Sequence, residues 1–282
     1  MDINQLKIYG QYLLPKRALT RLVGYAAGAK LGKITTLAIQ NFAKFYRVNL
    51  QEADGKITDY KTFNDFFARR LKSGARSIDN NDTSVVFPAD GRISAFGELK
   101  ENIQLQAKGH YFSTDALLAS ETDSALFDDG KFITVYLSPS DYHRVHIPFA
   151  GKLIKMTYVP GELFSVNPLY VKNIPELFSR NERVVCIFET PIGKMAIILV
   201  GAAIVRSIYM NWCGIVAPNK ANEPKTYEYP LRDISFHKGD EIGKFMMGST
   251  VICLFEKDKI KFDEALQIER HIQMGQKMGT IL

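Results

Sequence analysis

From about Val85 to the end of the chain, short β-prone runs alternate with turns rich in Gly, Pro and Asp. Runs of this length, bounded by turn residues, are typical of strands in an antiparallel or mixed sheet. The runs are SVVFPADGRISAFGEL, KFITVYLS, KLIKMTYV, RVVCIFET, KMAIILVGAAIV and STVICLF. STDALLAS and NPLYVKNIPELFSRN are instead expected to be helical insertions. The sequence therefore predicts a compact β body with short helices inserted into it.

The first fifty residues have a different pattern, with apolar residues at helical spacing that Pro15 and the glycines near residue 30 divide into two or three amphipathic helices. This segment has a net charge of +7, whereas the rest of the chain is close to neutral. Basic amphipathic helices with aromatic residues suit an anionic membrane surface. A helical cap packed on the core is the alternative, and no motif supports nucleic-acid binding. The basic residues are Lys7, Lys16, Arg17, Arg21, Lys30, Lys33, Lys44 and Arg47.

These two patterns predict an α+β protein, with an amphipathic helical N-terminal segment at 1–75 and a β-rich catalytic domain at 76–282. In the first, DYKTFNDFFARRLK is expected to form a short helix that exposes Arg69 and Arg70. The longest uncharged apolar run, 195–205, is too short to cross a membrane, and we expect no signal peptide. Three cysteines without paired spacing argue against a disulfide framework or a structural zinc site.

Three short motifs contain residues that could carry chemistry. Asp90 lies in FPADGRIS, His143 and His146 lie in YLSPSDYHRVHIPFAG, and Ser249 lies in GKFMMGSTVICLF. Each is weak alone: Asp90 suits an ordinary turn, and the HxxH pair has no third metal ligand at a convincing spacing. The two histidines would share a face on a helical turn but not on a strand. Together the motifs supply the Asp, His and Ser that activate a hydroxyl, although their spacing does not establish that they meet.

With these motifs, the sequence resembles the phosphatidylserine decarboxylases of the long bacterial type. The resemblance covers almost the whole chain, and Met247 stands where the family usually has Leu before Gly-Ser-Thr, a change of similar volume. The matching blocks are YLLPKRALTRLVG, TFNDFFARRL, FPADGRIS, LQAKGHYFS, YLSPSDYHRVHIP, YVPGELFSVNPL, LFSRNERVVCIF, ILVGAAIV and GKFMMGSTVICLF.

The resemblance implies a self-processing enzyme. Asp90 would orient His146, and His146 would take the proton of Ser249, whose hydroxyl would attack the carbonyl carbon of Gly248. Cleavage between 248 and 249 would leave a pyruvoyl group at Ser249, which would form a Schiff base with the amine of phosphatidylserine. Loss of CO2 would give phosphatidylethanolamine, with His143 as the proton donor. No metal would be needed.

The resemblance also implies that the segment GELFSVN, with Ser165, lines the headgroup site. The large and small chains would stay together after cleavage. The cleaved protein is a possible homodimer and would lie on the cytoplasmic face of the cell membrane. Three other interpretations remain open. They are a serine hydrolase that uses Asp90, His146 and Ser249, an HxxH metal enzyme, and a peripheral membrane-binding homologue that does not process itself.

Overall fold

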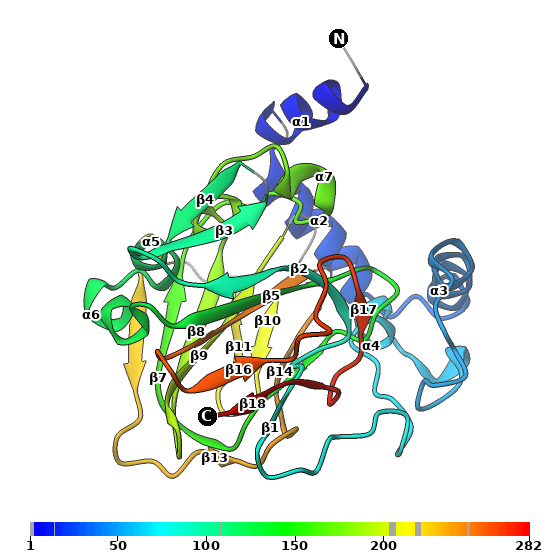
Figure 1. Cartoon of the computed structure of the whole chain (residues 1–282). Helices are drawn as coiled ribbons and strands as arrows, with labels where there is room; N and C mark the ends of the chain where they lie inside the picture. Colours follow the sequence, from blue (N-terminus) through cyan, green and yellow to red (C-terminus); the bar gives the residue numbers. More distant parts are fainter. Residues whose placement is uncertain (1–2, 14, 108, 203–206, 218–220, 247–248) are drawn as a thin grey trace.

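The computed structural model describes residues 3–13, 15–107, 109–202, 207–217, 221–246 and 249–282 (Figure 1). Its first part contains three helices, α1 (Ile3–Leu13), α2 (Lys16–Gly28) and α3 (Lys33–Tyr46). Pro15 precedes α2 and Gly32 precedes α3, so the predicted breaks fall at the helix boundaries. The helical half of the predicted fold class is therefore confirmed. No helix in the described ranges is long and apolar enough to cross a membrane.

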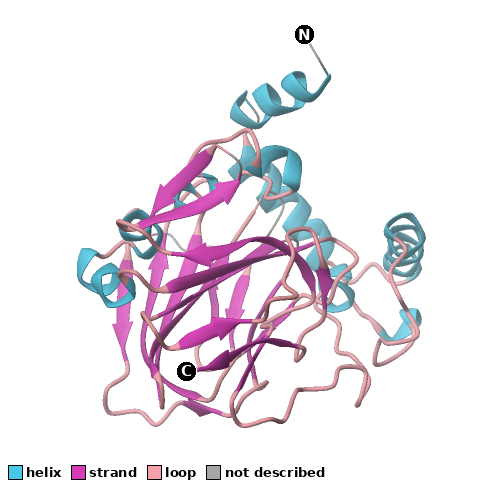
Figure 2. Cartoon of the chain, viewed as in Figure 1, coloured by secondary structure: helices cyan, strands magenta, loops and turns pink. Residues whose placement is uncertain are grey.

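The third helix connects to the body of the protein through a short segment that contains η1 (Ile57–Asp59) and α4 (Phe63–Phe67). Thr62 and Asp65 begin α4 with a capping box, in which each side chain accepts a hydrogen bond from the other residue's backbone N–H. Ile39 and Ala43 of α3 pack against α4 in a small apolar cluster. In Figure 2, α3 lies at the right-hand edge of the molecule, outside the strands.

The rest of the chain is built around a nine-stranded sheet in which every neighbouring pair is antiparallel. The β-rich half of the prediction is therefore also confirmed. In order across the sheet, its strands are β12 (Lys225–Glu228), β7 (Gly151–Val159), β8 (Arg183–Thr190), β9 (Gly193–Val200), β15 (Ser249–Phe255), β5 (Lys131–Leu137), β2 (Gly91–Glu98) and β17 (His271–Ile272), with β13 (Ser235–Phe236) also beside β7.

Smaller sheets and helices surround this sheet. A four-stranded sheet has the order β11 (Gly214–Ala217), β10 (Ile208–Met210), β14 (Glu241–Phe245) and β6 (Arg144–His146). A three-stranded sheet has the order β1 (Ser84–Val86), β18 (Lys277–Ile281) and β16 (Ile260–Phe262), and a hairpin joins β3 (Ile103–Ala107) to β4 (His110–Ser113). The predicted helical insertions appear as short helices. They are α5 (Thr114–Leu118), α6 (Glu121–Ser124), η2 (Ala125–Phe127), α7 (Pro168–Val171) and α8 (Leu177–Arg180).

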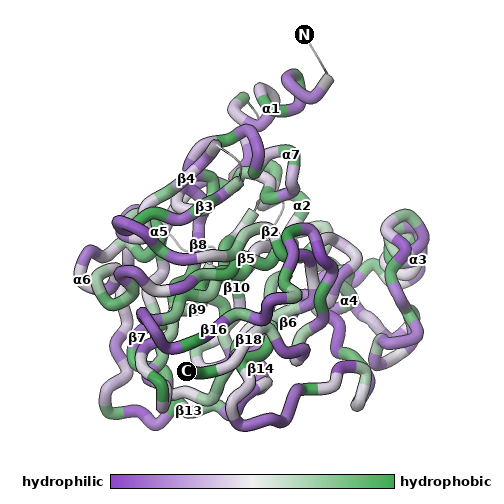
Figure 3. Tube along the Cα trace, viewed as in Figure 1, coloured by the Kyte–Doolittle hydropathy of each residue, from purple (hydrophilic) through white to green (hydrophobic). Residues whose placement is uncertain are grey.

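Strand β15 lies in the middle of the large sheet and is buried on both faces. Val251 and Cys253 belong to one large apolar cluster, and Ile252 and Leu254 belong to a second. Because successive side chains of a strand point to opposite faces, this alternation places one core on each side of the sheet. Figure 3 shows the apolar colouring concentrated along the strands inside the molecule.

The chain changes sheets just before this buried strand. β14 ends at Phe245 in the four-stranded sheet, and β15 begins at Ser249 in the nine-stranded sheet. The Gly-Ser motif therefore lies at a crossing between two sheets and not within an ordinary hairpin. The boundary between 1–75 and 76–282 stays a prediction.

Candidate active site

Ser249 is the first residue of β15 and is fully buried. It lies opposite Leu137, the last residue of β5, and the chain that leaves β5 returns past it as the segment that carries His143. The Ser249 Oγ is 3.4 Å from Nδ1 of His143. The fold thus brings together two residues that are 106 positions apart in sequence.

A tight turn fixes the orientation of His143. The Asp141 carboxylate accepts hydrogen bonds from the backbone N–H (2.7 Å) and the hydroxyl (2.8 Å) of Ser138. The Ser138 carbonyl oxygen in turn lies 2.9 Å from Nε2 of His143. Because a carbonyl can only accept, Nε2 carries the proton, and the lone pair of Nδ1 faces the Ser249 hydroxyl. The ring of Phe67, from α4, lies against the imidazole at a centroid distance of 4.2 Å.

Burial also fixes the charge state of His143. It lowers the pKa of the imidazole well below its usual range, and the nearby Asp141 only partly opposes this effect. The ring is therefore neutral at physiological pH, as a base must be. A contact of 3.4 Å is long for a hydrogen bond, but such contacts commonly tighten when a reaction begins. The pair can therefore exchange a proton between the serine oxygen and the imidazole.

His146 occupies a separate position at the end of β6. Its Nδ1 donates to the carbonyl oxygen of Gly239 (2.7 Å), so its Nε2 accepts from the hydroxyl of Tyr142 (3.2 Å). Burial lowers the pKa of this imidazole as well. The backbone N–H of His146 donates to the carbonyl oxygen of Pro88, which brings the motif FPADGRIS beside β6.

Asp90 lies within this motif, is buried, and is held by an arginine. Arg76 donates from Nε to Oδ1 (2.9 Å) and Oδ2 (3.0 Å) of Asp90 and from Nη2 to Oδ2 (2.5 Å), and the backbone N–H of Met274 donates to Oδ1 (2.9 Å). Burial acts to lower the pKa of Arg76, but its hydrogen bonds to Asp90 and Glu52 outweigh that effect and raise it. The next residue, Gly91, allows a close approach, because a Cβ there would lie 2.3 Å from the Tyr136 carbonyl oxygen.

The expected relay from Asp90 through His146 to Ser249 is not the hydrogen-bonding arrangement of this structure. Both ring nitrogens of His146 are already engaged, the carboxylate of Asp90 is paired with Arg76, and Ser249 contacts His143 instead. The physical reason is that His143 directly precedes the strand β6, which ends at His146, and residues three apart on extended backbone do not share a face. The catalytic roles of these residues stay a prediction.

The other predicted site residues have no described side-chain contact with Ser249. Gly248 and Met247 lie outside the described residues. Ser165 is half-buried, and its backbone N–H donates to the side chain of Gln11 in α1 (3.2 Å). The adjacent Val166 lines a small cavity with Tyr136, the residue that pairs with the one after Ser249. The segment thus approaches the strand pair that carries the serine, and the role of the Ser165 hydroxyl stays a prediction.

Sequence reasoning missed three residues that shape this site. Arg76 falls in the polar, turn-rich stretch SGARSIDNNDTS, and Tyr142 lies between the prolines of the histidine motif, so neither residue stands out in the sequence. Arg69 was expected to be exposed but is only 4% exposed, because its guanidinium folds back onto the carbonyl oxygens of Ser140 and Asp141. An arginine directly after a Phe-rich helix was the available signal for a buried cation.

A buried serine whose hydroxyl faces a neutral imidazole, at a crossing between two sheets, is an arrangement suited to chemistry at the serine. Comparison with known protein families identifies the family of this chain. The family model described as phosphatidylserine decarboxylase matches residues 63–280, and a model described as PSD matches residues 6–47. The chain therefore belongs to the phosphatidylserine decarboxylase family, as its motifs predict.

Curated relatives match over almost their whole length. The phosphatidylserine decarboxylase proenzyme of Psychromonas ingrahamii is 48% identical over 280 residues, which covers 99% of this chain and 98% of the relative. The proenzyme of Shewanella pealeana is 48% identical over 285 residues, and that of Aliivibrio fischeri is 50% identical over 284 residues. Both alignments cover 99% of each chain.

Proposed function

We propose that this chain is the proenzyme of a phosphatidylserine decarboxylase that cleaves its own backbone between Gly248 and Ser249 and then converts phosphatidylserine to phosphatidylethanolamine and CO2. The observation that carries this proposal is the buried Ser249, which directly follows the bond to be cleaved and faces His143, the histidine assigned here to the later proton transfer. The relatives named as proenzymes over almost equal lengths support the expectation of a later cleavage.

The proposed cleavage uses only this chain and one water molecule. The Ser249 oxygen attacks the carbonyl carbon of Gly248, and the peptide nitrogen leaves it, so that the amide becomes an ester. Loss of the Ser249 α-proton then expels the Gly248 carboxylate and leaves a dehydroalanine. Water hydrolyses that residue with release of ammonia, and a pyruvoyl group remains at position 249. A base must remove the first proton, and a neutral imidazole is suited to this.

The surroundings of Ser249 fit such a group. Its position is closed off from solvent, and His143 is within reach of the side chain. When formed, the pyruvoyl group supplies a carbonyl that accepts the substrate amine and the electron pair released as CO2 leaves. His143 is then placed to hold the proton that returns to the α-carbon, because its Nδ1 faces residue 249.

For the cleavage step we retain Asp90 and His146, on the basis of the family resemblance of their motifs. Their buried positions, linked through the backbone of Pro88, support a common structural role. For His146 to act on Ser249, its hydrogen bond from Tyr142 must break and the side chains must rearrange from the observed positions. The proposed cleavage and decarboxylation steps therefore depend on different histidines, and substitution of each histidine can test this.

The proposed products would remain associated. Residues 249–282 contribute β15, which is flanked by β9 and β5, and also β17 and β18, which pair with β2 and β1. These ladders are made between the two proposed chains and do not depend on the bond at 248. A small chain held in the middle of a nine-stranded sheet would stay in place.

We also propose that the N-terminal helices attach the enzyme to an anionic membrane surface. While α3 packs one face on α4, it leaves Ile34 and Phe45 65% and 79% exposed, and Leu22 of α2 is 69% exposed. Together with the +7 charge of this segment, these side chains suit the boundary of anionic headgroups and acyl chains.

Vesicle sedimentation tests this attachment. Leu22→Ser is expected to weaken binding to phosphatidylglycerol vesicles roughly ten-fold, since a fully buried leucine is worth about 1.5–3 kcal/mol. Leu231→Ser is the matched control, because Leu231 is 98% exposed but lies outside the N-terminal helices. Equal binding by both variants would contradict the proposal.

Denaturing mass spectrometry of the purified protein tests the cleavage. Wild type is expected to give two chains, 1–248 and 249–282, the second lighter than its sequence predicts because serine has become pyruvoyl. Ser249→Ala is expected to remain one chain. A serine hydrolase or a non-processing membrane protein would keep wild type at full length with an unmodified serine, and an HxxH metal enzyme would in addition contain bound metal.

A further inference from the structure

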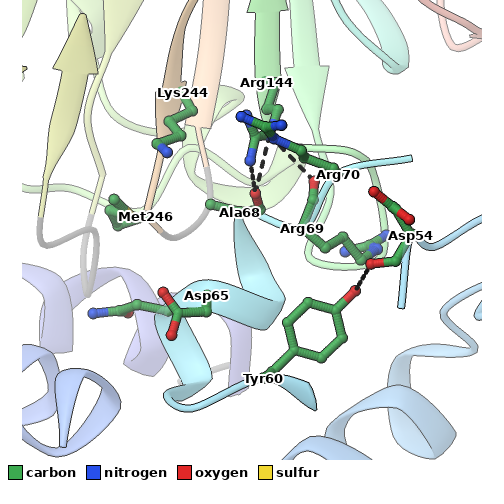
Figure 4. A pocket seen from close by; sticks show the side chains of 10 residues that line it. Asp54, Tyr60, Asp65, Ala68, Arg69, Arg70, Arg144, Lys244 and Met246 are labelled. Carbon is green, nitrogen blue, oxygen red and sulfur yellow. Dashed lines mark hydrogen bonds between the residues drawn. The ribbon is translucent and has the colours of Figure 1, made fainter. Parts of the chain in front are cut away.

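A pocket of about 260 Å³ lies where the segment after α3 meets the four-stranded sheet (Figure 4). Four cationic side chains line it, whereas only two carboxylates do. Figure 4 shows Lys244 and Arg144 next to each other above Asp65 and Tyr60. The cations are Arg69, Arg70, Arg144 and Lys244, and the carboxylates are Asp54 and Asp65.

Lys244 is the most informative of these cations. It lies directly across the β14–β6 ladder from Arg144, and like charges in that position repel each other. Within the described parts of the chain its ammonium group has no ion pair or hydrogen bond, and its Nζ lies 4.7 Å from the centroid of the Tyr209 ring. Burial, together with the positive charges of Arg144 and Arg70, lowers the pKa of Lys244. An anion between these cations would relieve the repulsion.

The carboxylates nearby are engaged elsewhere, and none of them forms an ion pair with Lys244 among the described residues. Glu241 forms a two-pronged pair with Nη1 of Arg144, at 2.9 Å to each oxygen. Asp65 accepts the backbone N–H of Thr62 in the cap of α4. Arg144 is further fixed by the carbonyl oxygen of Ala68, which accepts from its Nε and Nη2. One wall of the pocket is therefore a preorganised cationic surface.

Arg69 gives an independent indication of a ligand. It is 4% exposed, yet its Nε and Nη1 have no hydrogen-bond partner among the described residues. The side-chain oxygen of Asn64, which also lines the pocket, is likewise buried without a partner there. Buried donors are almost always satisfied, so an unsatisfied guanidinium beside a cationic pocket indicates a place for a polar ligand.

Several residues that line the pocket lie next in sequence to residues of the proposed active site. Ala68 follows Phe67, which stacks on His143, and Arg144 follows His143 itself. Met246 also lines the pocket, and three residues of chain span at most about 11 Å to Ser249. In a phosphatidylserine headgroup, only the β-carbon and one ester oxygen separate the α-carbon from the phosphorus.

We infer that this pocket binds the phosphodiester of the lipid headgroup that is being decarboxylated, with Lys244 and the Arg69 guanidinium as the principal donors. This inference rests on the proposed function for the identity of the substrate, but the charge of the pocket does not depend on it. Phosphate oxygens are suited to a pocket that combines a point charge with arginine N–H groups.

Binding to an uncleaved protein tests the pocket without catalysis. The full chain with Ser249→Ala is titrated by 31P NMR with glycerophosphoserine or inorganic phosphate, and by calorimetry with L-serine as the phosphate-free control. Glycerophosphoserine is expected to bind more tightly than either of the others. Lys244→Gln should raise its Kd about ten-fold or more, as expected for the loss of one charge-assisted hydrogen bond.

Two further variants exclude a purely structural effect. Lys244→Arg should restore binding, because it keeps the charge and the donors. Lys225→Gln is the matched control, since Lys225 also lies over a tyrosine ring, at 5.2 Å, but on the edge strand β12. The inference is overturned if Lys244→Gln binds as wild type does, or if L-serine binds as tightly as glycerophosphoserine. Equal affinity for inorganic phosphate would indicate a free-phosphate site and would also overturn the lipid assignment.

A second arm uses the self-cleaved enzyme with short-chain phosphatidylserine. Lys244→Gln should leave cleavage unchanged and raise KM more than it lowers kcat. An unchanged KM would refute the substrate subsite. If wild type neither cleaves nor releases CO2, the proposed function fails, and the binding titration still decides whether the pocket accepts a phosphodiester.

Discussion

The buried pair of Arg76 and Asp90 gives the most quantitative prediction. We consider Arg76→Met in a Ser249→Ala background, where the protein stays a single chain. Asp90 is 3% exposed, so the variant leaves a buried carboxylate with the backbone N–H of Met274 as its remaining described donor. Removing one member of a buried ion pair typically costs about 3–5 kcal/mol. Because the Met274 hydrogen bond survives, we expect a loss near the lower end, about 3 kcal/mol.

Urea denaturation followed by tryptophan fluorescence measures this loss. The single tryptophan, Trp212, packs against Phe188 and Phe236 and so reports on the body of the protein. Lys257→Met is the control, because it removes an exposed ion pair with Asp129 and should leave the midpoint nearly unchanged.

A double substitution isolates the buried charge as the cause. Asp90→Asn combined with Arg76→Met removes both charges, so the double variant should be less destabilised than the sum of the two single variants. A loss below about 1 kcal/mol for Arg76→Met, or simple additivity, would refute the reasoning. In a background with Ser249 intact, Arg76→Met should also slow cleavage, because Arg76 is a positioning residue for Asp90.

The two histidines are expected to act in different steps. His146→Ala should abolish cleavage, as seen on denaturing gels. His143→Ala should still cleave itself but lose most of its CO2 release. The reverse pattern would make His143 the cleavage base. Burial lowers the pKa of both rings, so the unfolded chain binds more protons, and stability should fall as pH drops below about 6.5. Urea denaturation at pH 7 and pH 5 should show this loss, which for His143 approaches about 1.4 kcal/mol per pH unit because burial lowers the pKa of its imidazole to about 3. His143→Asn should remove that part of the pH dependence. Gly91→Ala should lower the thermal midpoint sharply, because its Cβ would lie 2.3 Å from the Tyr136 carbonyl oxygen.

Local patterns predicted the fold class because each element follows its own chemistry. Pro15 and Gly32 mark the helix boundaries, and STVICLF becomes the buried β15. The order of strands across the sheets was not predictable in this way. β15 pairs with β5 and β9, which lie far from it in sequence, and no short-range signal specifies such partners.

The site was predictable in its residue types but not in its contacts. The motifs identified Ser249, Asp90 and both histidines, but the pairing of Ser249 with His143 depends on the turn that Asp141 makes with Ser138. The buried state of Arg69 likewise depends on carbonyl oxygens that lie more than seventy positions away along the chain. Long-range contacts of this kind leave no periodic trace in the sequence.

The position of the proposed cleavage bond explains how a chain could cut itself without losing its fold. β14 and β15 belong to different sheets, and the described ladder pairs of the two strands lie on either side of the connection between them. Ser249 is nevertheless held in place, since it begins a strand that is paired with β5 on one side and β9 on the other. Cleavage of a peptide bond inside a strand would break the hydrogen-bond ladder of that strand, and the same ladder would keep the bond from reacting. A bond at the crossing combines a fixed nucleophile with a connection that the fold does not require.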